Sequence, residues 1–139
     1  MLHLEATLQK TLKASDRSLT RQRRQVFRAL AEHGPLSAAH LADRLSATLD
    51  RATVYRCLAL FEELGVVNRI WHGFKSTLEL SEIFTPHHHH ATCSQCGKSI
   101  DLYSRDLEQA IAQLTLEKEF LALGHSVEIY GYCQTCQTA

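Results

Sequence analysis

Apolar side chains return every three or four positions along residues 1–65, which is the period of an amphipathic helix. Start and stop signals divide this stretch into four segments, because Ser, Thr and Asp cap helix N-termini whereas Gly and Pro end helices. The expected helices begin at Leu2, after Thr20, after Ser37 and after Thr48 or Asp50, and the second and fourth end at Gly34-Pro35 and Gly65. The chain is therefore expected to open with four short helices.

The hydrophobic pattern changes from a helical to a strand-like period after Gly65. VVNRIW and KSTLEL predict two strands, joined in a hairpin at His72-Gly73. Three helices followed by a two-stranded hairpin make a winged helix-turn-helix, whose last helix enters the major groove of DNA while the wing touches the backbone. We therefore expect residues 1–80 to form a winged-helix DNA-binding domain.

The polar side of the fourth helix supplies the candidate DNA contacts. Arg and Tyr at its start can reach bases and phosphates, and a cluster of arginines around the start of the second helix adds affinity that does not depend on base sequence. The candidate residues are Arg17, Arg21, Arg23, Arg24, Arg51, Thr53, Tyr55 and Arg56. A helical packing module with a basic face is the alternative interpretation of this pattern.

Pro86 separates the wing from the second half of the chain, because proline cannot continue a hydrogen-bonded ladder. We expect residues 81–86 to be a hinge and residues 87–139 to be a small α/β dimerisation domain that binds metal, which makes the whole chain α+β. Within this domain the patterns predict strands at SIDL, EFLAL and SVEIYGY, the last two meeting at Gly124-His125, and a helix capped by Ser104. A homodimer formed through an exposed strand would have the two-fold symmetry of palindromic half-sites.

Composition is typical of a soluble globular protein. Hydrophobic residues make up 45% and charged residues 22% of the 139 positions, and no apolar run approaches the roughly 18 residues that span a bilayer. With no signal peptide in the sequence, we expect a cytoplasmic protein with no membrane partner. Charge is uneven, since residues 1–80 carry 12 basic and 8 acidic side chains whereas residues 81–139 carry 3 and 7. The first part has the sign to meet phosphates, and the second has the sign to hold cations.

Two C-x2-C pairs predict a structural zinc site. Each pair presents two sulfurs to one ion with little backbone strain, and zinc prefers a tetrahedron of such donors. Four sulfurs close the site and leave no open position for catalysis. The four ligands would be Cys93, Cys96, Cys133 and Cys136. Two disulfides or a redox C-x-x-C are the alternatives, and a reducing compartment disfavours disulfides.

A run of four histidines, residues 87–90, leads directly into the first cysteine pair. If the run is extended, its side chains alternate between two faces, so His88 and His90 point one way while His87 and His89 point the other. This alternation predicts two His-x-His metal sites rather than one. Neutral imidazole suits zinc, iron(II), nickel or copper, so residue type alone does not choose the ion.

Taken together, these motifs resemble the ferric uptake regulator family over nearly the whole chain. The resemblance rests on ATVYR at 52–56, HHHH at 87–90, CSQCGK at 93–98, His125, and CQTC at 133–136. Family members share a winged-helix fold and act as homodimeric, metal-activated repressors of bacterial genes. The resemblance therefore implies that the chain is a repressor whose partners are a double-stranded DNA operator and a second copy of itself.

The resemblance also assigns the candidate ligands to three sites. The four cysteines match the family's structural zinc ligands. The regulatory site at the hinge is matched by Glu79, His88 and His90, with His33 as a further candidate near the position where the family's iron sensors supply a histidine. A second site inside the dimerisation domain is matched by His87, His89, Glu108 and His125.

Departures from the family pattern bear on the sensed metal. His89 stands where many iron regulators of the family have Asp, and an all-nitrogen stretch favours zinc. Zinc regulators often place a cysteine in the hinge site, however, and none occurs between Cys57 and Cys93, which keeps iron(II) as the alternative regulatory ion.

Three other functions compete with a metal-dependent repressor. One is a peroxide sensor whose bound iron oxidises its own ligands, and another is a constitutive DNA-binding protein with structural zinc only. A zinc hydrolase is the least favoured, because it leaves the winged helix unexplained. We therefore expect the protein not to be an enzyme.

Overall fold

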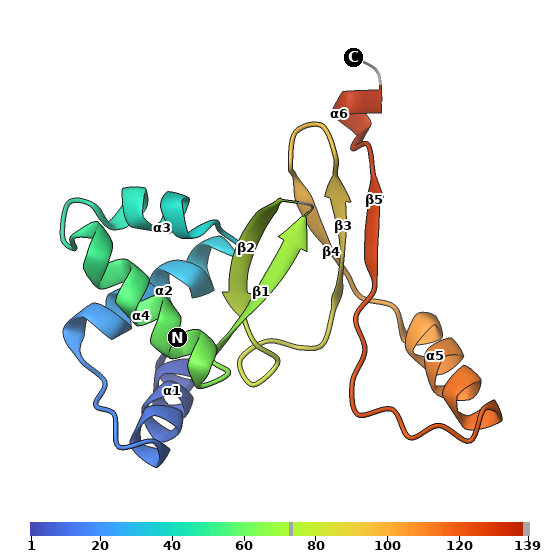
Figure 1. The fold of residues 1–139 in the computed structure, drawn as a ribbon, viewed down its shortest axis with the longest axis horizontal. Helices are drawn as coiled ribbons and strands as arrows, with labels where there is room; N and C mark the ends of the chain where they lie inside the picture. The colour runs from blue at the N-terminus through green and yellow to red at the C-terminus, as the bar shows by residue number, and fades with distance from the viewer. Residues whose placement is uncertain (73, 138–139) are drawn as a thin grey trace. The chain divides into compact units, whose positions relative to one another are not determined.

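The computed structural model describes residues 1–72 and 74–137, apart from the side chain of His72 (Figure 1). The chain divides into two compact units, Met1–Pro86 and His87–Ala139, each of which has its own architecture. The first contains helices α1 (Leu2–Ala14), α2 (Arg21–His33), α3 (Ala38–Leu45) and α4 (Arg51–Glu63), followed by strands β1 (Val67–His72) and β2 (Lys75–Leu80). None of the helices in the described part of the chain has the length and apolar character to cross a membrane.

Helices α2, α3 and α4 begin at predicted caps. The Thr20 hydroxyl accepts the backbone N–H of Arg23 at 3.3 Å, and Ser37 accepts that of His40 at 3.1 Å. Of the two candidates for the fourth helix, Asp50 is the cap, since its carboxylate accepts the N–H of Thr53 at 2.9 Å. These side chains satisfy amide groups that the first turn of a helix leaves unpaired.

One hydrophobic core holds the first unit together. Its fully buried side chains come from all four helices and from the wing, and they include Leu8, Leu12, Val26, Phe27, Leu41, Val54, Phe61 and Leu78. Each such side chain contributes about 1.5–3 kcal/mol to folding by its burial. Phe84 joins this core, with its ring centroid 5.1 Å from that of Phe27 in an edge-to-face arrangement. The predicted hinge segment, 81–86, therefore packs on the first unit through Ser81 and Phe84.

The wing is an antiparallel hairpin attached to the helices by its second strand. β1 and β2 pair from Val67↔Leu80 to His72↔Lys75. Leu36, just before α3, exchanges two backbone hydrogen bonds with Leu78, of 3.0 and 2.8 Å. The predicted turn residue Gly73 lies outside the described residues. The first unit is thus a winged helix-turn-helix, as predicted.

The second unit is a three-stranded sheet with one main helix. β3 (His89–Cys93) lies between β4 (Ser99–Leu102) and β5 (Glu128–Gly131), antiparallel to β4 and parallel to β5 (Figure 1). Helix α5 (Arg105–Glu117) follows β4, and Ser104 caps it by accepting the N–H of Leu107 at 3.2 Å. A four-residue helix, α6 (Gln134–Gln137), follows Cys133 and contains Cys136. The α+β class predicted from the sequence is confirmed.

The predicted strand at EFLAL, residues 119–123, is wrong. α5 ends in a turn at which Glu119 takes a φ of 51°, and residues 120–127 run on without ladder hydrogen bonds to β5 in the described chain. The hydrophobic pattern of a strand is present, but a strand needs a paired edge, and this segment leaves Leu121 and Leu123 84% and 94% exposed. SVEIYGY forms a shorter strand than predicted, and it pairs with β3 instead of with its chain neighbour.

Candidate metal centre

The four cysteines meet at one end of the sheet in the second unit. Cys93 is the last residue of β3, and the chain then turns at Gly97, whose φ is 75°. The Gly97 N–H donates to the Cys93 carbonyl at 2.9 Å. Cys133 lies between β5 and α6, and Cys136 lies within α6. Because the Ser94 amide donates to the Gly131 carbonyl at 2.8 Å, the two C-x2-C turns are held side by side.

Sulfur geometry distinguishes zinc from the disulfide alternative. All four Sγ atoms lie within 4.8 Å of one another, and Cys96 Sγ is 3.7 Å from Cys133 Sγ. A disulfide needs about 2.05 Å, whereas two thiolates at about 2.3 Å from one tetrahedral zinc lie about 3.8 Å apart. The described cysteines are all free thiols. The cluster therefore fits a four-cysteine zinc site.

The thiols of Cys93 and Cys136 have shifted pKa values, in opposite directions. Hydrogen bonds from the backbone amides of Cys133, Cys96 and Gln95 lower the pKa of Cys93 to about 6. Hydrogen bonding to the Cys133 side chain, followed by burial and by the other two sulfurs, raises the pKa of Cys136 to about 12. Four neighbouring thiols cannot all ionise alone, so a bound cation is what would allow four thiolates to coexist.

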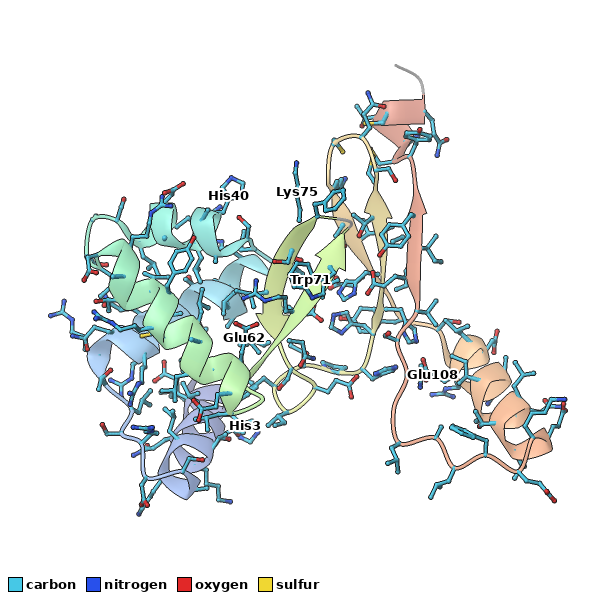
Figure 2. The ribbon with its side chains drawn as sticks, in the orientation of Figure 1. His3, His40, Glu62, Trp71, Lys75 and Glu108 are labelled. Carbon is cyan, nitrogen blue, oxygen red and sulfur yellow. The ribbon has the colours of Figure 1, made fainter. Side chains whose placement is uncertain are left out.

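A second cluster gathers three histidines around Glu108, which lies on the first turn of α5 (Figure 2). His87 Nε2 is 3.1 Å from His125 Nε2, and the Glu108 carboxylate lies 2.9 Å from His125 Nε2 and 2.7 Å from His89 Nε2. Ligands about 2.0–2.1 Å from one tetrahedral ion are about 3.3 Å apart, so these donors fit a metal with three nitrogens and one carboxylate. His89 is 2% exposed, which makes it the buried wall of the cluster.

The neighbouring imidazoles also tune Glu108. Desolvation alone would raise its pKa, but the hydrogen bond from His89 and the charges of His125 and His87 outweigh it and hold the pKa of Glu108 below its ordinary value. The side chain is therefore a carboxylate at neutral pH, which is the form that binds a cation.

His88 and His90 form a separate pair on the other face of the same segment. Their ring centroids are 4.8 Å apart, and His88 also stacks on Tyr103 at 5.5 Å. His90 is buried, and its Nε2 lies 3.9 Å from Asp101 Oδ1. The chain thus brings together two histidines and a carboxylate within the second unit. Glu79 on β2 and His33 on the last turn of α2 belong to the first unit, and their part in this site stays a prediction.

Two carboxylates beside His90 were missed from the sequence. Asp101 faces His90 across the β3–β4 ladder, and Glu128 faces it across the β3–β5 ladder. Glu128 Oε1 lies 3.3 Å from His90 Nδ1. Their acidic character was visible, but only the strand registers bring them to His90, and the parallel pairing of β5 with β3 was not predicted.

The candidate DNA-contacting residues lie on the first turns of α4 and around the start of α2. Arg51, Tyr55 and Arg56 are exposed, and Thr53 is half-buried beside its cap. Arg51 pairs with Asp43 at 2.7 Å, and Arg56 donates to the Thr53 hydroxyl at 3.1 Å. Of the other four, Arg17 and Arg21 are exposed, Arg23 donates to the Ser18 carbonyl, and Arg24 pairs with Glu5 at 3.3 Å.

Known proteins with this sequence pattern and fold are regulators of metal uptake and peroxide response. The signature of the ferric uptake regulator family matches residues 14–130. The peroxide-responsive repressor PerR of Staphylococcus saprophyticus is 30% identical over 123 residues, which cover 86% of this chain and 82% of that protein.

Solved structures agree over most of the chain. The ferric uptake regulator of Vibrio cholerae, whose structure reveals rearrangement of its DNA-binding domains, matches with a TM-score of 0.75 at 31% identity, over 89% of this chain and 98% of that one. A zinc uptake regulator complexed with zinc and DNA matches with a TM-score of 0.62 at 27% identity, over 99% and 95% of the two chains.

Proposed function

The chain belongs to the ferric uptake regulator family, and from this premise we propose that it is a homodimeric repressor whose binding to a DNA operator depends on a regulatory metal ion. The observation that carries the proposal is the pairing of His88 with His90 beside Asp101, at the very start of the second unit. A metal-binding pair at this position is adjacent in the chain to the DNA-binding unit, which ends at Pro86.

Each metal cluster has a different task in this proposal. The cysteine cluster is closed and would hold the second unit folded. The His88 and His90 pair, completed by Glu79 and with His33 as a further candidate, would join the two units and fix the two winged helices of a dimer at operator spacing. Losing the ion would release them, so the binding-competent geometry would become a minor population and apparent affinity would fall by that fraction.

Zinc and iron(II) both suit the regulatory role. The second cluster offers three imidazoles and one carboxylate, a donor set that favours zinc. The hinge pair has Asp101 as an oxygen donor and no cysteine nearby, a set that also suits iron(II). We therefore retain zinc as the first candidate for the sensed ion and iron(II) as the second.

A second copy of the chain is the proposed partner of the apolar surface on the second unit. Large hydrophobic side chains are exposed there, which in a soluble protein marks an interaction surface. They are Ile100, Leu114, Leu116, Phe120, Leu121, Leu123 and Ile129. The same surface explains why α5 has no buried residue among those described, although its apolar stripe is regular.

The proposal is tested by fluorescence anisotropy of a labelled duplex, selected by the zinc-loaded protein from a random library, in chelator-buffered metal. We expect DNA binding to switch on at the very low free zinc that a cell maintains. If much higher free zinc is needed, an anaerobic iron(II) titration decides for iron. The double variant His88→Ala/His90→Ala should remain dimeric by analytical ultracentrifugation and lose the metal response, and a retained response would rule out the hinge as the regulatory site.

Peroxide sensing is the second candidate, because the relative from Staphylococcus saprophyticus is a peroxide-responsive repressor and the hinge pair includes the carboxylate of Asp101. Iron(II) held by such a site would react with peroxide, and the peroxide would supply the oxygen atom that is added to a histidine ligand. Mass spectrometry of the iron-loaded chain after peroxide treatment would show a 16 Da increase on His88 or His90 if this candidate is right. Equal operator affinity with and without chelator would instead favour a constitutive DNA-binding protein.

A further inference from the structure

Glu128 occupies an unusual place behind His90. It lies on β5 as the register partner of His90 in the parallel ladder, and its Oε1 is 3.3 Å from His90 Nδ1. Its other oxygen, Oε2, is buried and has no hydrogen-bond partner among the described residues. The carboxylate therefore directs its one observed hydrogen bond at the imidazole.

This contact bears on which nitrogen of His90 carries the proton. An ionised carboxylate can only accept, so an ionised Glu128 would favour the tautomer with the proton on Nδ1 and the lone pair on Nε2. Nε2 is also the nitrogen on the side of Asp101, at 3.9 Å. Metal-binding histidines commonly donate their second N–H to a carboxylate in this way, which fixes the ring and makes it a stronger ligand.

His88 stacks on Tyr103 with ring centroids 5.5 Å apart. It is half-buried, whereas His90 is 3% exposed. Burial therefore restricts rotation of the His90 ring more than that of the His88 ring.

We propose that Glu128 is a positioning residue for the regulatory site, acting through the tautomer and ring orientation of His90. This inference rests on the proposed function. β5 also links the site to the cysteine cluster, because the strand that carries Glu128 ends at Gly131 and Cys133 follows two residues later. Zinc bound at the cysteine cluster would tie the end of this strand to Cys93 at the end of β3.

Direct cobalt(II) binding tests the proposal without DNA. The starting protein is the full chain with zinc loaded in its cysteine cluster. The substitutions His87→Ala and His125→Ala remove the second cluster. This protein is titrated in buffered cobalt(II) while the visible d–d bands are followed. Adding Glu128→Gln should raise the free cobalt at half-saturation about 10- to 100-fold, the usual cost of losing such a partner. Glu128→Asp should recover part of this loss, and Glu119→Gln, an exposed carboxylate in the same unit, should change nothing.

Several outcomes would overturn the inference. One is a wild-type midpoint in Glu128→Gln. If Glu128 had a purely structural role, Glu128→Gln would lower the bound zinc and the unfolding temperature. Glu128→Asp would then restore both of these quantities but would not restore the cobalt midpoint. In the wild-type zinc-loaded chain, long-range ¹H–¹⁵N spectra should show His90 protonated at Nδ1, assigned by its absence in His90→Ala, and protonation at Nε2 would also refute the proposal.

Failure of the proposed function would look different. If metal has no effect on DNA binding by the parent chain while Glu128→Gln still weakens cobalt(II) binding, the site and its positioning residue stand and only the regulatory role falls.

Discussion

Cys96 and Cys133 have their sulfur atoms 3.7 Å apart although 36 residues separate them in the chain. Between them lie β4, α5 and β5, so one ion at this position would close most of the second unit into a loop. Few side chains in the described part of this unit are buried, and the buried ones lie on β3. We therefore expect its fold to depend on the cysteine cluster more than on a hydrophobic core.

Replacing Cys96 with alanine should unfold the second unit and leave the first intact. The physical reason is that structural zinc supplies folding free energy directly, about 10–16 kcal/mol in small zinc domains. Hydrogen exchange measured by mass spectrometry should lose protection in residues 89–131 only, and the bound zinc should fall. Cys57→Ala is the matched control, because Cys57 is buried in the core of the first unit. The Cys57→Ala protein should bind as much zinc as the wild type. Unchanged protection in Cys96→Ala would contradict this dependence.

Replacing Phe27 with alanine should destabilise the first unit by about 3–5 kcal/mol, the usual cost of emptying a buried aromatic site. Phe27 is fully buried and packs edge-to-face on Phe84. Urea unfolding followed by Trp71, the only tryptophan, reports on this unit alone. Phe74→Ala removes the same side chain from a fully exposed position and should cost almost nothing. Equal losses in the two variants would argue against the packing described.

The acid stability of the first unit should depend on Glu5. Its hydrogen bond from Arg28, aided by the charges of Arg28 and Arg24 against an opposing desolvation effect, lowers its pKa below the ordinary value of 4.5. Because the folded pKa is the lower one, the stabilisation is present above the unfolded pKa and disappears as pH falls through the folded pKa. Glu5→Gln should therefore unfold at a lower temperature than wild type near neutrality.

The difference should shrink below about pH 4.5 and vanish once the folded state also binds the proton. Glu63→Gln, an exposed carboxylate on the same unit, provides the control for charge removal. A gap in melting temperature that stayed constant down to pH 2 would show that Glu5 stabilises by packing alone.

Replacing Arg56 with alanine should weaken operator binding and reduce its salt dependence. Arg56 is exposed on the first turns of α4, and a lost phosphate contact lowers the slope of log affinity against log salt by about 1. Anisotropy titrations at several salt concentrations measure both quantities. Arg105→Ala, which removes an exposed arginine from the second unit, should keep the wild-type slope. An unchanged slope for Arg56→Ala would remove it from the DNA interface.

Local signals in the sequence predicted most of the fold. Thr20, Ser37 and Asp50 act within a few residues of their partners, so the helix starts could be read directly. The C-x2-C spacing of each cysteine pair can be read from the sequence itself. The alternation of the histidine side chains between two faces requires only an extended backbone. These features depend on neighbours in the chain, which is why they could be predicted.

Features that depend on distant partners could not be predicted. Residues 119–123 have the composition of a strand, but the chain offers them no ladder partner among the described residues. Glu128 meets His90 only because β5 returns parallel to β3, and nothing near either residue encodes that pairing. Asp101 likewise reaches His90 through the register of β4.

A single extended stretch, from His87 to Cys93, carries candidate ligands of all three proposed metal sites. Its side chains alternate between two faces: His87 and His89 lie on one face, and His88 and His90 lie on the other. Cys93 lies at the end of the stretch. Removing one residue from this stretch would exchange the faces of every histidine before the gap and deliver the wrong donors to two sites at once. We therefore expect this segment to tolerate a single substitution better than a change of length.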